Sequence, residues 1–442
     1  MSARGDPGGS AASGDPAAAD GAEGARRPDV TSALVIFALT YLAVAAGRFP
    51  YLSVDRPAAA LLGAVTMVAA GVLTPAEAGA AVNGETLGLL LGMMILSAYL
   101  GEAGFFRWAS WLVIRVAHTP RTLLWALVLA AGALSALLVN DTVCLMMTPL
   151  VLRVVDDAEL PPIPYLLAVA FGSNAGSAAT LTGNPQNMIV GTLSGISYAR
   201  FAGALVLPAL ASLLLVAAIL HFTFRRQLPR RPLVPEALPA PEVDRRLLAK
   251  ALGALLLALA GFVAGFELAW TALFAGALCM AVAGRAPREA LQRVNWPLLV
   301  FFAGLFVVVA GIAKAGVTGR IYEAAVAPAL GAGAARQVVV FGGFTAVASQ
   351  IVSNVPFVIV AGEWIPRLAE PHLLWLATAL AATLAGNLTI VGSVANVIVL
   401  ELAGARGQIG FWRFFRIGAV VTGVTLAAAL AILLAERALG LI

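Results

Sequence analysis

Apolar stretches of about 18 to 25 residues recur along this chain from residue 33 to residue 436. Crossing a hydrocarbon core of about 30 Å takes a helix of about 20 apolar residues. Of the 442 residues, 61% are hydrophobic and only 12% are charged, whereas an ordinary soluble domain carries about 25% charged residues. The sequence therefore predicts an all-α integral membrane protein that crosses the bilayer many times.

The second half of the chain resembles the first. Four blocks recur in the same order, and their offsets stay within five residues of one another, which chance similarity between apolar helices would not produce. The pairs are 89–104 (LLLGMMILSAYLGEAG) with 301–316 (FFAGLFVVVAGIAKAG), 135–142 (SALLVNDT) with 349–356 (SQIVSNVP), 180–187 (TLTGNPQN) with 389–396 (TIVGSVAN), and 196–201 (ISYARF) with 409–414 (IGFWRF). We infer two copies of one structural unit.

Each copy is predicted to hold five full spans. For the first copy, residues 31–224, these lie at about 32–48, 57–73, 86–104, 163–191 and 200–224, and for the second copy, residues 246–442, at about 246–265, 268–285, 296–314, 371–401 and 412–436. Residues 1–30, rich in Gly, Ala, Ser, Pro and Asp, predict a disordered tail. The Pro-rich, charged residues 225–245 predict a linker between the copies.

Between the third and fourth span of each copy lies an apolar segment with polar residues in its middle, at about 121–155 and 335–367. Such a segment could form one long helix or a helical hairpin that enters and leaves on the same side. We favour the re-entrant hairpin, because a polar tip at the membrane centre is tolerated only where protein buries it or where it lines a water-filled cavity.

Five spans per copy is an odd number, so the second copy should enter from the opposite face, giving inverted-topology repeats. With this topology, nine basic residues fall on the side of the N-terminus and the remaining 19 of the 28 on the other side, which the positive-inside rule makes cytoplasmic. The nine are Arg4, Arg26, Arg27, Arg200, Lys314, Arg320, Arg336, Arg367 and Arg437. The N-terminus is thus expected outside and the central linker in the cytoplasm.

Polar groups that interrupt the spans mark the candidate site. In 163–191, Gly183 frees the backbone and Pro185 removes a donor, so the helix should break and expose amides and carbonyls as ligands. The equivalent span, 371–401, repeats this break. Any one of these polar residues could equally well serve to pack helices together as to bind a ligand. Four polar breaks at symmetric positions, however, favour a binding site. The candidate substrate-binding and ion-binding residues are Asn140, Asp141, Thr142, Ser173, Asn174, Thr180, Thr182, Gly183, Asn184, Asn187, Ser353, Asn354, Thr389, Gly392, Ser393 and Asn396.

Asp141 is the sharpest single candidate, because a carboxylate near the bilayer centre is costly unless it is used or paired. Its counterpart in the second copy is Val355. This asymmetry points to a role that one copy alone supplies, as a proton acceptor or as a ligand for a coupling cation. The alternative is a hydrated tip residue or a partner of a nearby arginine.

Other classes of function find little support. The chain has a net charge of +5, but its basic residues lie in short loops and do not alternate with aromatic residues, which argues against nucleic-acid binding. Cys144, Cys279 and the three histidines form no metal-binding or redox cluster, so no cofactor is expected beyond Na⁺ or H⁺ as a coupling ion. No HExxH motif, catalytic Ser/His pairing or acid dyad indicates an enzyme, and no P-loop indicates an ATP-driven pump.

The paired motifs resemble those of the ion transporter superfamily that contains the citrate-transporter-like proteins, the divalent anion/sodium symporters, the arsenite efflux permeases and the melanosomal P protein. The motifs are VNDTVCLMMTPLVL (139–152), GSNAGSAATLTGNPQNMIVG (172–191), SNVPFVIV (353–360) and GNLTIVGSVANVIV (386–399). The resemblance covers nearly the whole chain after residue 30. It implies an elevator-type transporter, commonly a homodimer, whose hairpins and broken helices form a mobile transport domain.

In the dicarboxylate branch of this superfamily, Ser-Asn-Thr tripeptides at both hairpin tips bind substrate and sodium. Here the tips read Asn140-Asp141-Thr142 and Ser353-Asn354-Val355, so the match extends to Asn140, Thr142, Ser353 and Asn354. The acidic first tip is more similar to the arsenite-efflux and P-protein branch, which implies a proton-linked anion or metalloid function.

We therefore expect a secondary active transporter of a small anion, such as a carboxylate, an inorganic oxyanion or a metalloid, coupled to a proton or sodium gradient. The alternative is a sodium/proton-type cation antiporter of the same superfamily. The location expected is a bacterial inner membrane, since only two of the basic residues are lysines, as in GC-rich bacteria.

Overall fold

A computed structural model describes residues 30–46, 55–229, 232–233, 240–331 and 333–442, and every regular element in these ranges is a helix. The predicted disordered tail lies outside them except for residue 30, as does part of the predicted linker.

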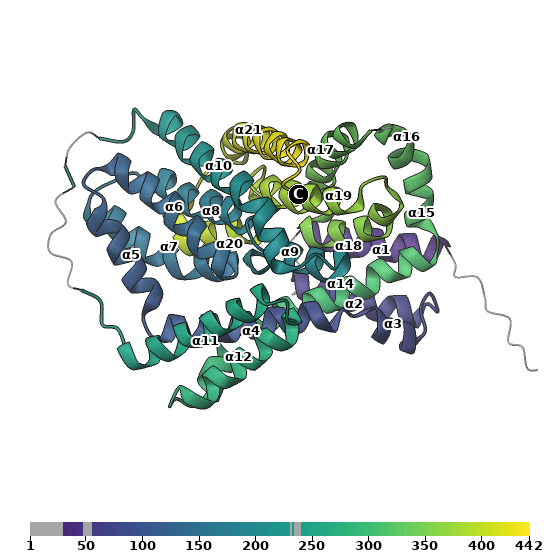
Figure 1. The fold of residues 1–442 in the computed structure, drawn as a ribbon, viewed down its shortest axis with the longest axis horizontal. Coiled ribbons are helices and arrows are strands. Elements are labelled where there is room, and N and C mark those ends of the chain that lie inside the picture. Colours follow the sequence, from purple (N-terminus) through teal and green to yellow (C-terminus); the bar gives the residue numbers. More distant parts are fainter. Residues whose placement is uncertain (1–29, 47–54, 230–231, 234–239, 332) are drawn as a thin grey trace, which may run out of the picture.

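The helices of the two halves occur in the same order (Figure 1). The first half contains α1 (Val30–Ala46), α2 (Arg56–Ala69), α3 (Pro75–Ala81), α4 (Gly84–Glu102), α5 (Phe105–Val116), α6 (Pro120–Leu137), α7 (Asn140–Asp157), α8 (Pro162–Ser177), η1 (Leu181–Gly183), α9 (Pro185–Ser194) and α10 (Tyr198–Phe224). The second half contains α11 (Arg245–Val263), α12 (Leu268–Val282), α13 (Pro287–Gln292), α14 (Trp296–Lys314), α15 (Val317–Ile321), η2 (Tyr322–Val326), α16 (Ala327–Leu330), α17 (Ala334–Val352), α18 (Asn354–Trp364), η3 (Ile365–Arg367), α19 (Pro371–Ala385), η4 (Ile390–Gly392), α20 (Val394–Ala403), η5 (Gly404–Gly407) and α21 (Phe411–Ala438).

Each segment with a polar middle folds as two helices rather than one. In the first half, α6 ends at Leu137 and α7 begins at Asn140, with extended backbone at Leu138 and Val139 between them. In the second half, α17 and α18 meet at Ser353, whose φ of 70° lies in the left-handed region that residues other than glycine rarely adopt. Both turns therefore present their polar residues at the first turn of a helix.

The two spans expected to break do so. Helix α8 ends at Ser177 and α9 begins at Pro185, with the short η1 turn between them. Gly183 lies so close to the end of α8 that a Cβ there would stand 2.2 Å from the Ser177 carbonyl oxygen. In the second half, α19 and α20 are separated in the same way by η4.

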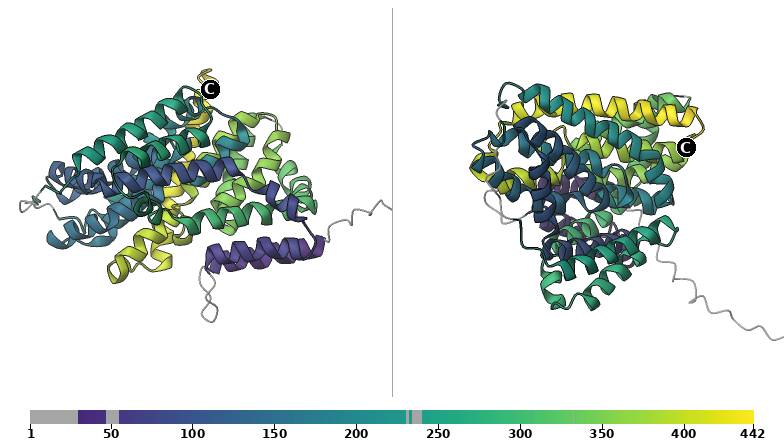
Figure 2. Two further views of the ribbon diagram at one scale, coloured as in Figure 1. Left: turned by 90° about the horizontal axis from the view of Figure 1, so that it is seen from below. Right: turned by 60° about the vertical axis from the view of Figure 1, so that its left-hand side comes forward.

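The helices form two groups in Figure 1. Helices α2, α4, α11, α12 and α14, called the lower layer here, pack on one another through the pairs α4 with α12 and α2 with α14. Helices α6–α10 and α17–α21, called the upper layer, hold both helix pairs and both breaks, with α6 against α8 and α17 against α19. Figure 2 shows α10 and α21 running side by side along one edge, and α1 at the periphery.

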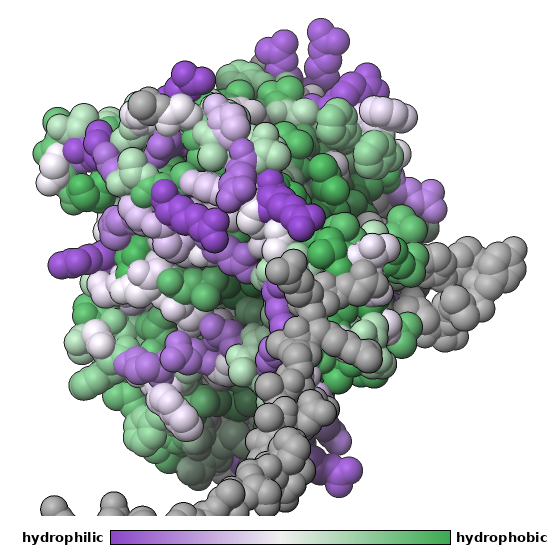
Figure 3. All heavy atoms as spheres, turned by 90° about the vertical axis from the view of Figure 1, so that its right-hand side faces the viewer, coloured by the Kyte–Doolittle hydropathy of each residue, from purple (hydrophilic) through white to green (hydrophobic). Residues whose placement is uncertain are grey.

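Much of the outer surface is apolar. Among the described residues, seven helices are long and apolar enough to cross a membrane, namely α4, α6, α10, α11, α14, α17 and α21. Large apolar side chains project outward, such as Trp270, which is 73% exposed, and apolar residues cover broad areas of the face in Figure 3, with hydrophilic residues gathered in patches. An apolar exterior of this extent is suited to lipid, so the chain is a multi-pass membrane protein.

Several short helices between the predicted spans were not anticipated from the sequence, namely α3, α5, α13, α15 and α16. Helix α5, of 12 residues, follows α4 directly and is too short to cross the bilayer. Phe106 and Val113 are buried and the helix packs against α6 and α7, while Trp108 and Leu112 are exposed. A run this short, interrupted by Arg107 and Arg115, is passed over by a search for apolar segments long enough to cross the bilayer.

Candidate functional site

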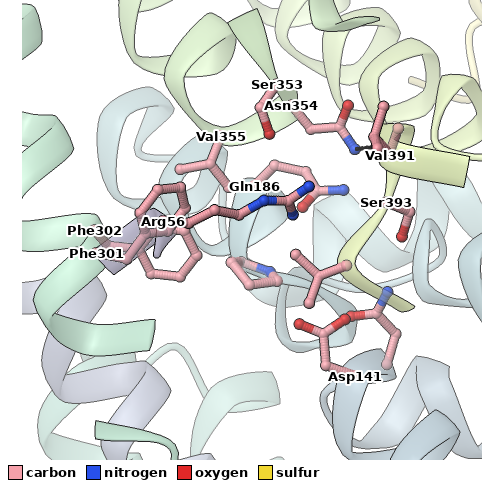
Figure 4. Close-up of a pocket in the computed structure, with 14 residues that line it drawn as sticks. Arg56, Asp141, Gln186, Phe301, Phe302, Ser353, Asn354, Val355, Val391 and Ser393 are labelled. Atoms are coloured by element: carbon pink, nitrogen blue, oxygen red, sulfur yellow. Dashed lines mark hydrogen bonds between the residues drawn. The ribbon is translucent and has the colours of Figure 1, made fainter. Parts of the chain in front are cut away.

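Both helix tips and both breaks meet at one pocket between the two layers (Figure 4). About 460 Å³ of space free of protein atoms lies in and at the mouth of the pocket, part of it open to solvent. Its lining residues are Arg56, Asn140, Asp141, Pro185, Gln186, Phe301, Phe302, Ser353, Asn354, Val355, Val391, Gly392, Ser393 and Val394. The upper layer supplies most of this lining, and the lower layer supplies Arg56 and the two phenylalanines.

Four helices direct their N-terminal ends at this pocket. Helix α7 begins at Asn140, α9 at Pro185, α18 at Asn354 and α20 at Val394, and all four residues line the pocket. The N-terminal end of a helix carries free N–H groups and about half a positive charge. Four such ends around one space favour a bound anion.

The first break is held open by side-chain hydrogen bonds. Asn184 caps α9, because its Oδ1 accepts a bond of 2.9 Å from the backbone N–H of Asn187. The side-chain amide of Asn187 donates to the carbonyl oxygens of Ser177 at 3.1 Å and Thr180 at 3.0 Å. These bonds satisfy carbonyl groups that the interrupted helix leaves without intrahelical partners.

The second break uses the same arrangement. The side-chain amide of Asn396 donates to the carbonyl oxygens of Gly386 at 2.8 Å and Thr389 at 3.0 Å. Thr389 in turn donates to Oε1 of Gln350 on α17, at 2.9 Å. The break is therefore tied to the helix pair that carries the second tip.

The two breaks are also bonded to each other. Asn174 on α8 donates to Oδ1 of Asn387 at 2.9 Å and of Asn396 at 3.2 Å, and its own Oδ1 accepts from Ser393 at 2.9 Å. On α19, Thr383 accepts from Asn184 at 3.2 Å. Each half therefore supports the break of the other half.

The predicted site residues separate into two groups. Six of them line the pocket: Asn140, Asp141, Ser353, Asn354, Gly392 and Ser393. Those that do not line it are Thr142, Ser173, Asn174, Thr180, Thr182, Gly183, Asn184, Asn187, Thr389 and Asn396. Apart from Gly183 and Thr142, the residues of this second group form side-chain hydrogen bonds that hold the breaks and the first tip in place, as the bond from Ser173 to the Asn140 carbonyl does at 3.3 Å.

The tips leave polar atoms without protein partners. Asp141 is only 8% exposed and forms no ion pair with any residue that the structure describes. The Oδ1 atoms of Asn140 and Asn354 are buried and accept no hydrogen bond within the described part of the chain. Oxygen acceptors are the ligands that hard cations prefer, and they also accept from hydroxyl groups.

Two polar residues of the pocket escaped the sequence analysis. Gln186 lies inside the break motif TLTGNPQN and points into the pocket, so the motif itself held the signal. Arg56 opens α2 at the start of an apolar run, where an arginine is usually a membrane-interface residue. Nothing in the local sequence indicates that the packing of α2 on α14 carries it to the tips.

Comparisons with known proteins agree with this architecture. The profile of the citrate transporter family (CitMHS) matches residues 33–381. The uncharacterized transporter Rv2684 of Mycobacterium tuberculosis is 32% identical over 418 residues, which cover 90% of this chain and 96% of the relative. The silicon efflux transporter LSI3 of Oryza sativa subsp. japonica is 28% identical, covering 85% of this chain and 91% of the relative.

A solved structure shares the fold. The Alcanivorax borkumensis YdaH transporter superposes with a TM-score of 0.57 at 18% identity, covering 93% of this chain and 97% of that chain. The family profile spans most of the sequence, and the relatives are named as transporters. The chain therefore belongs to the citrate transporter family of the ion transporter superfamily and is a membrane transporter.

Proposed function

We propose that this protein is a secondary active transporter that carries a small anion through the pocket between the two layers. The observation that carries the proposal is the convergence of four helix N-terminal ends on one space lined by the polar tips. Backbone N–H groups at helix ends recognise negative charge without selecting its carrier. A carboxylate, an inorganic oxyanion and a metalloid oxyanion all fit this description.

We place the binding site of the coupling ion at the two helix tips. Asp141, with the unpartnered Oδ1 atoms of Asn140 and Asn354, offers oxygen ligands to a sodium ion, and its carboxylate can instead take a proton. An anion beside an ionised Asp141 is repelled, and neutralising that carboxylate with H⁺ or Na⁺ removes the repulsion. Binding of the cation and of the anion would thus support each other.

The proposal includes two inverted repeats. Each of the five ion pairs among the described residues joins two side chains that the proposed topology places on the same side of the membrane, which supports that topology. The pairs are Glu77 with Lys314, Glu370 with Arg437, Asp156 with Arg406, and Arg285 with both Glu102 and Asp244. The same topology puts the N-terminus outside and the linker in the cytoplasm. A homodimer in a bacterial inner membrane completes the proposal.

We further infer an elevator movement in which the tips and breaks slide past the lower layer. It is supported by the position of the pocket between Phe302 of α14 and Val355 of α18. The test joins Phe302→Cys to Val355→Cys with a short bismaleimide, in a chain whose Cys144 and Cys279 are replaced by alanine. The cross-link should stop transport, and each single cysteine variant treated alike should keep it. Full transport by the cross-linked protein would contradict the elevator.

A cation antiporter is the second candidate, favoured by the buried carboxylate of Asp141, which could bind Na⁺ and H⁺ in turn.

The experiment that decides between the anion transporter and the cation antiporter uses proteoliposomes with the purified chain. Uptake of labelled citrate, succinate, sulfate, phosphate and arsenite is measured under imposed pH and sodium gradients, together with sodium-driven proton flux. Silicic acid is included because one relative is named a silicon efflux transporter. Anion uptake driven by a gradient supports the proposal, and sodium/proton exchange without anion movement replaces it with the antiporter.

A further inference from the structure

Arg56 is a charged residue that reaches the pocket from the opposite layer. It is the first residue of α2, between the N-cap residue Asp55 and Pro57. Pro57 restricts the backbone at this point, so the arginine starts from a fixed position. In Figure 4 its side chain extends into the pocket, and in this view the guanidinium lies between the second tip and Asp141.

The guanidinium has no protein partner among the described residues. The neighbouring Asp55 is engaged in capping α2, where its Oδ1 accepts from the N–H of Ala58 at 3.0 Å. Glu401 on α20 forms no ion pair with Arg56. The five N–H donors of an arginine side chain are therefore left for a ligand.

The surroundings strengthen the pull of this charge on an anion. Of the residues that line the pocket, Arg56 carries the only positive charge and Asp141 the only negative one. Phe301 and Phe302, which are 6% and 2% exposed, form an apolar wall beside it. A charge next to apolar side chains is screened less than a charge in water, so its attraction for a ligand anion is larger.

Arg56 and Asp141 face the same space without forming an ion pair. An arginine and a carboxylate that served only to neutralise each other would be in contact, as the guanidinium of Arg437 and the carboxylate of Glu370 are. Both charges of the pocket are therefore left without an ion-pair partner among the described residues.

The second half has no equivalent charge. Asp55 caps α2 and Glu267 caps α12 at an offset of 212 residues, which is also the offset between 89–104 and 301–316. The residue after each cap is Arg56 in the first half and Leu268 in the second. The lower layer therefore offers a positive charge at the start of α2, beside α14, and an uncharged residue at the equivalent start of α12.

We propose that Arg56 binds the negative charge of the transported anion from the lower layer, in the conformation in which the tips lie against α2 and α14. This assignment rests on the proposed function. It makes anion affinity higher in that conformation than in one in which the tips face α12, since Leu268 supplies no charge there. An uncharged substrate would gain less from Arg56, because it offers no negative charge to the guanidinium.

The test measures dissociation constants of the purified full-length chain for citrate, succinate, sulfate and phosphate, with silicic acid as the uncharged probe at neutral pH. Every anion that binds the wild type should bind Arg56→Gln about 10- to 100-fold more weakly, the loss expected for a charge-assisted contact. Arg56→Lys keeps the positive charge but lacks the planar set of donors of the guanidinium. Its anion affinity should lie between that of the wild type and that of Arg56→Gln. The control is Arg320→Gln, which removes an exposed arginine outside the pocket and should bind like the wild type.

The outcomes separate this inference from the proposed function. Unchanged anion affinity in Arg56→Gln overturns the role of Arg56, while anion uptake by the wild type in proteoliposomes would leave the transporter proposal standing. Binding of silicic acid alone by the wild type overturns the role as well. The melting temperature of each unliganded variant checks its fold. If Arg56→Gln does not fold, Arg56→Met, which keeps a long flexible side chain without the charge, decides: anion affinity equal to that of the wild type contradicts the assignment.

Discussion

The side-chain amide of Asn174 donates a 2.9 Å hydrogen bond to Oδ1 of Asn387, which lies 213 residues further along the chain. Thr383 is the residue of the second half equivalent to Asn174, at the offset of 209 residues that relates the two breaks. Its hydroxyl oxygen accepts a 3.2 Å hydrogen bond from the side-chain amide of Asn184, in the break of the first half. Residues at matching positions of the two halves therefore each reach into the break of the other. This reciprocal bonding explains how two interrupted helices stay together in the interior, where unpaired polar groups are costly.

Thr383 allows a direct test of this bonding. Thr383→Val keeps the shape of the side chain but removes the acceptor for Asn184 and Gln186 and the donor to Asn187. We expect the free energy of unfolding to fall by about 1 to 3 kcal/mol, because buried amides lose their partner. The measurement is the melting temperature in detergent, together with transport.

The matched control lies on the same helix. Thr378 is equally buried, and among the residues that the structure describes its hydroxyl bonds only to the Leu374 carbonyl one turn earlier. Thr378→Val should leave the melting temperature close to that of the wild type. Equal melting temperatures for the two variants would contradict a special role for the bonds between the halves.

Asp141→Asn tests the coupling ion. The amide cannot exchange a proton at neutral pH and gives sodium a neutral ligand, so we expect uptake to lose its response to whichever of the two gradients drives the wild type. The control is Asp157→Asn, which removes an exposed carboxylate at the other end of α7. Wild-type dependence on both gradients in Asp141→Asn would rule out this carboxylate as the coupling site.

Gly176 tests the close packing that positions the first helix pair. A Cβ at this residue would stand 2.2 Å from the carbonyl oxygen of Gly132 on α6. Gly176→Ala should push α6 away from α8 and lower the free energy of unfolding by about 1 to 3 kcal/mol. Gly203→Ala on α10 is the control, since a Cβ there meets nothing within 4 Å, and it should be neutral or stabilising by about 0.5 to 1 kcal/mol. The idea fails if both variants melt alike.

Glu77 should make stability depend on pH in the acid range. Its carboxylate accepts a 2.6 Å bond from Lys314 and further bonds from Thr74, which lower the pKa of Glu77 to about 2 from an ordinary value of 4.5. Because the folded pKa is the lower one, this stabilisation is present above pH 4.5 and is lost as pH falls from 4.5 toward 2.

Glu77→Gln should therefore melt below the wild type at pH 7, and the difference should shrink as the pH approaches 2. Because the pair is exposed, the effect should be small and weaker at high salt. Glu323→Gln removes an exposed carboxylate for which the structure shows no ion pair and serves as control. A difference between Glu77→Gln and the wild type that stays constant down to pH 2 would show that the Lys314 pair is not its cause.

The order of helices could be predicted from the sequence because the bilayer imposes it. Runs of apolar residues have to be long enough to cross the hydrocarbon core, and each polar interruption within them needs a protein environment. Gly183 with Pro185 and the polar stretch at Asn140 thus marked where the helices end. Helix α5, short and interrupted by Arg107 and Arg115, lacked such a signal.

The sequence by itself determined which side chains interrupt the helices, since local backbone chemistry decides where a helix must stop. Only the tertiary structure decided which of them face the pocket. Asn187 and Asn396 occupy equivalent positions in the two copies, and both are used to satisfy carbonyl groups rather than to line the space. Arg56 joins the site because α2 packs on α14, a contact between segments more than 200 residues apart that no local pattern encodes.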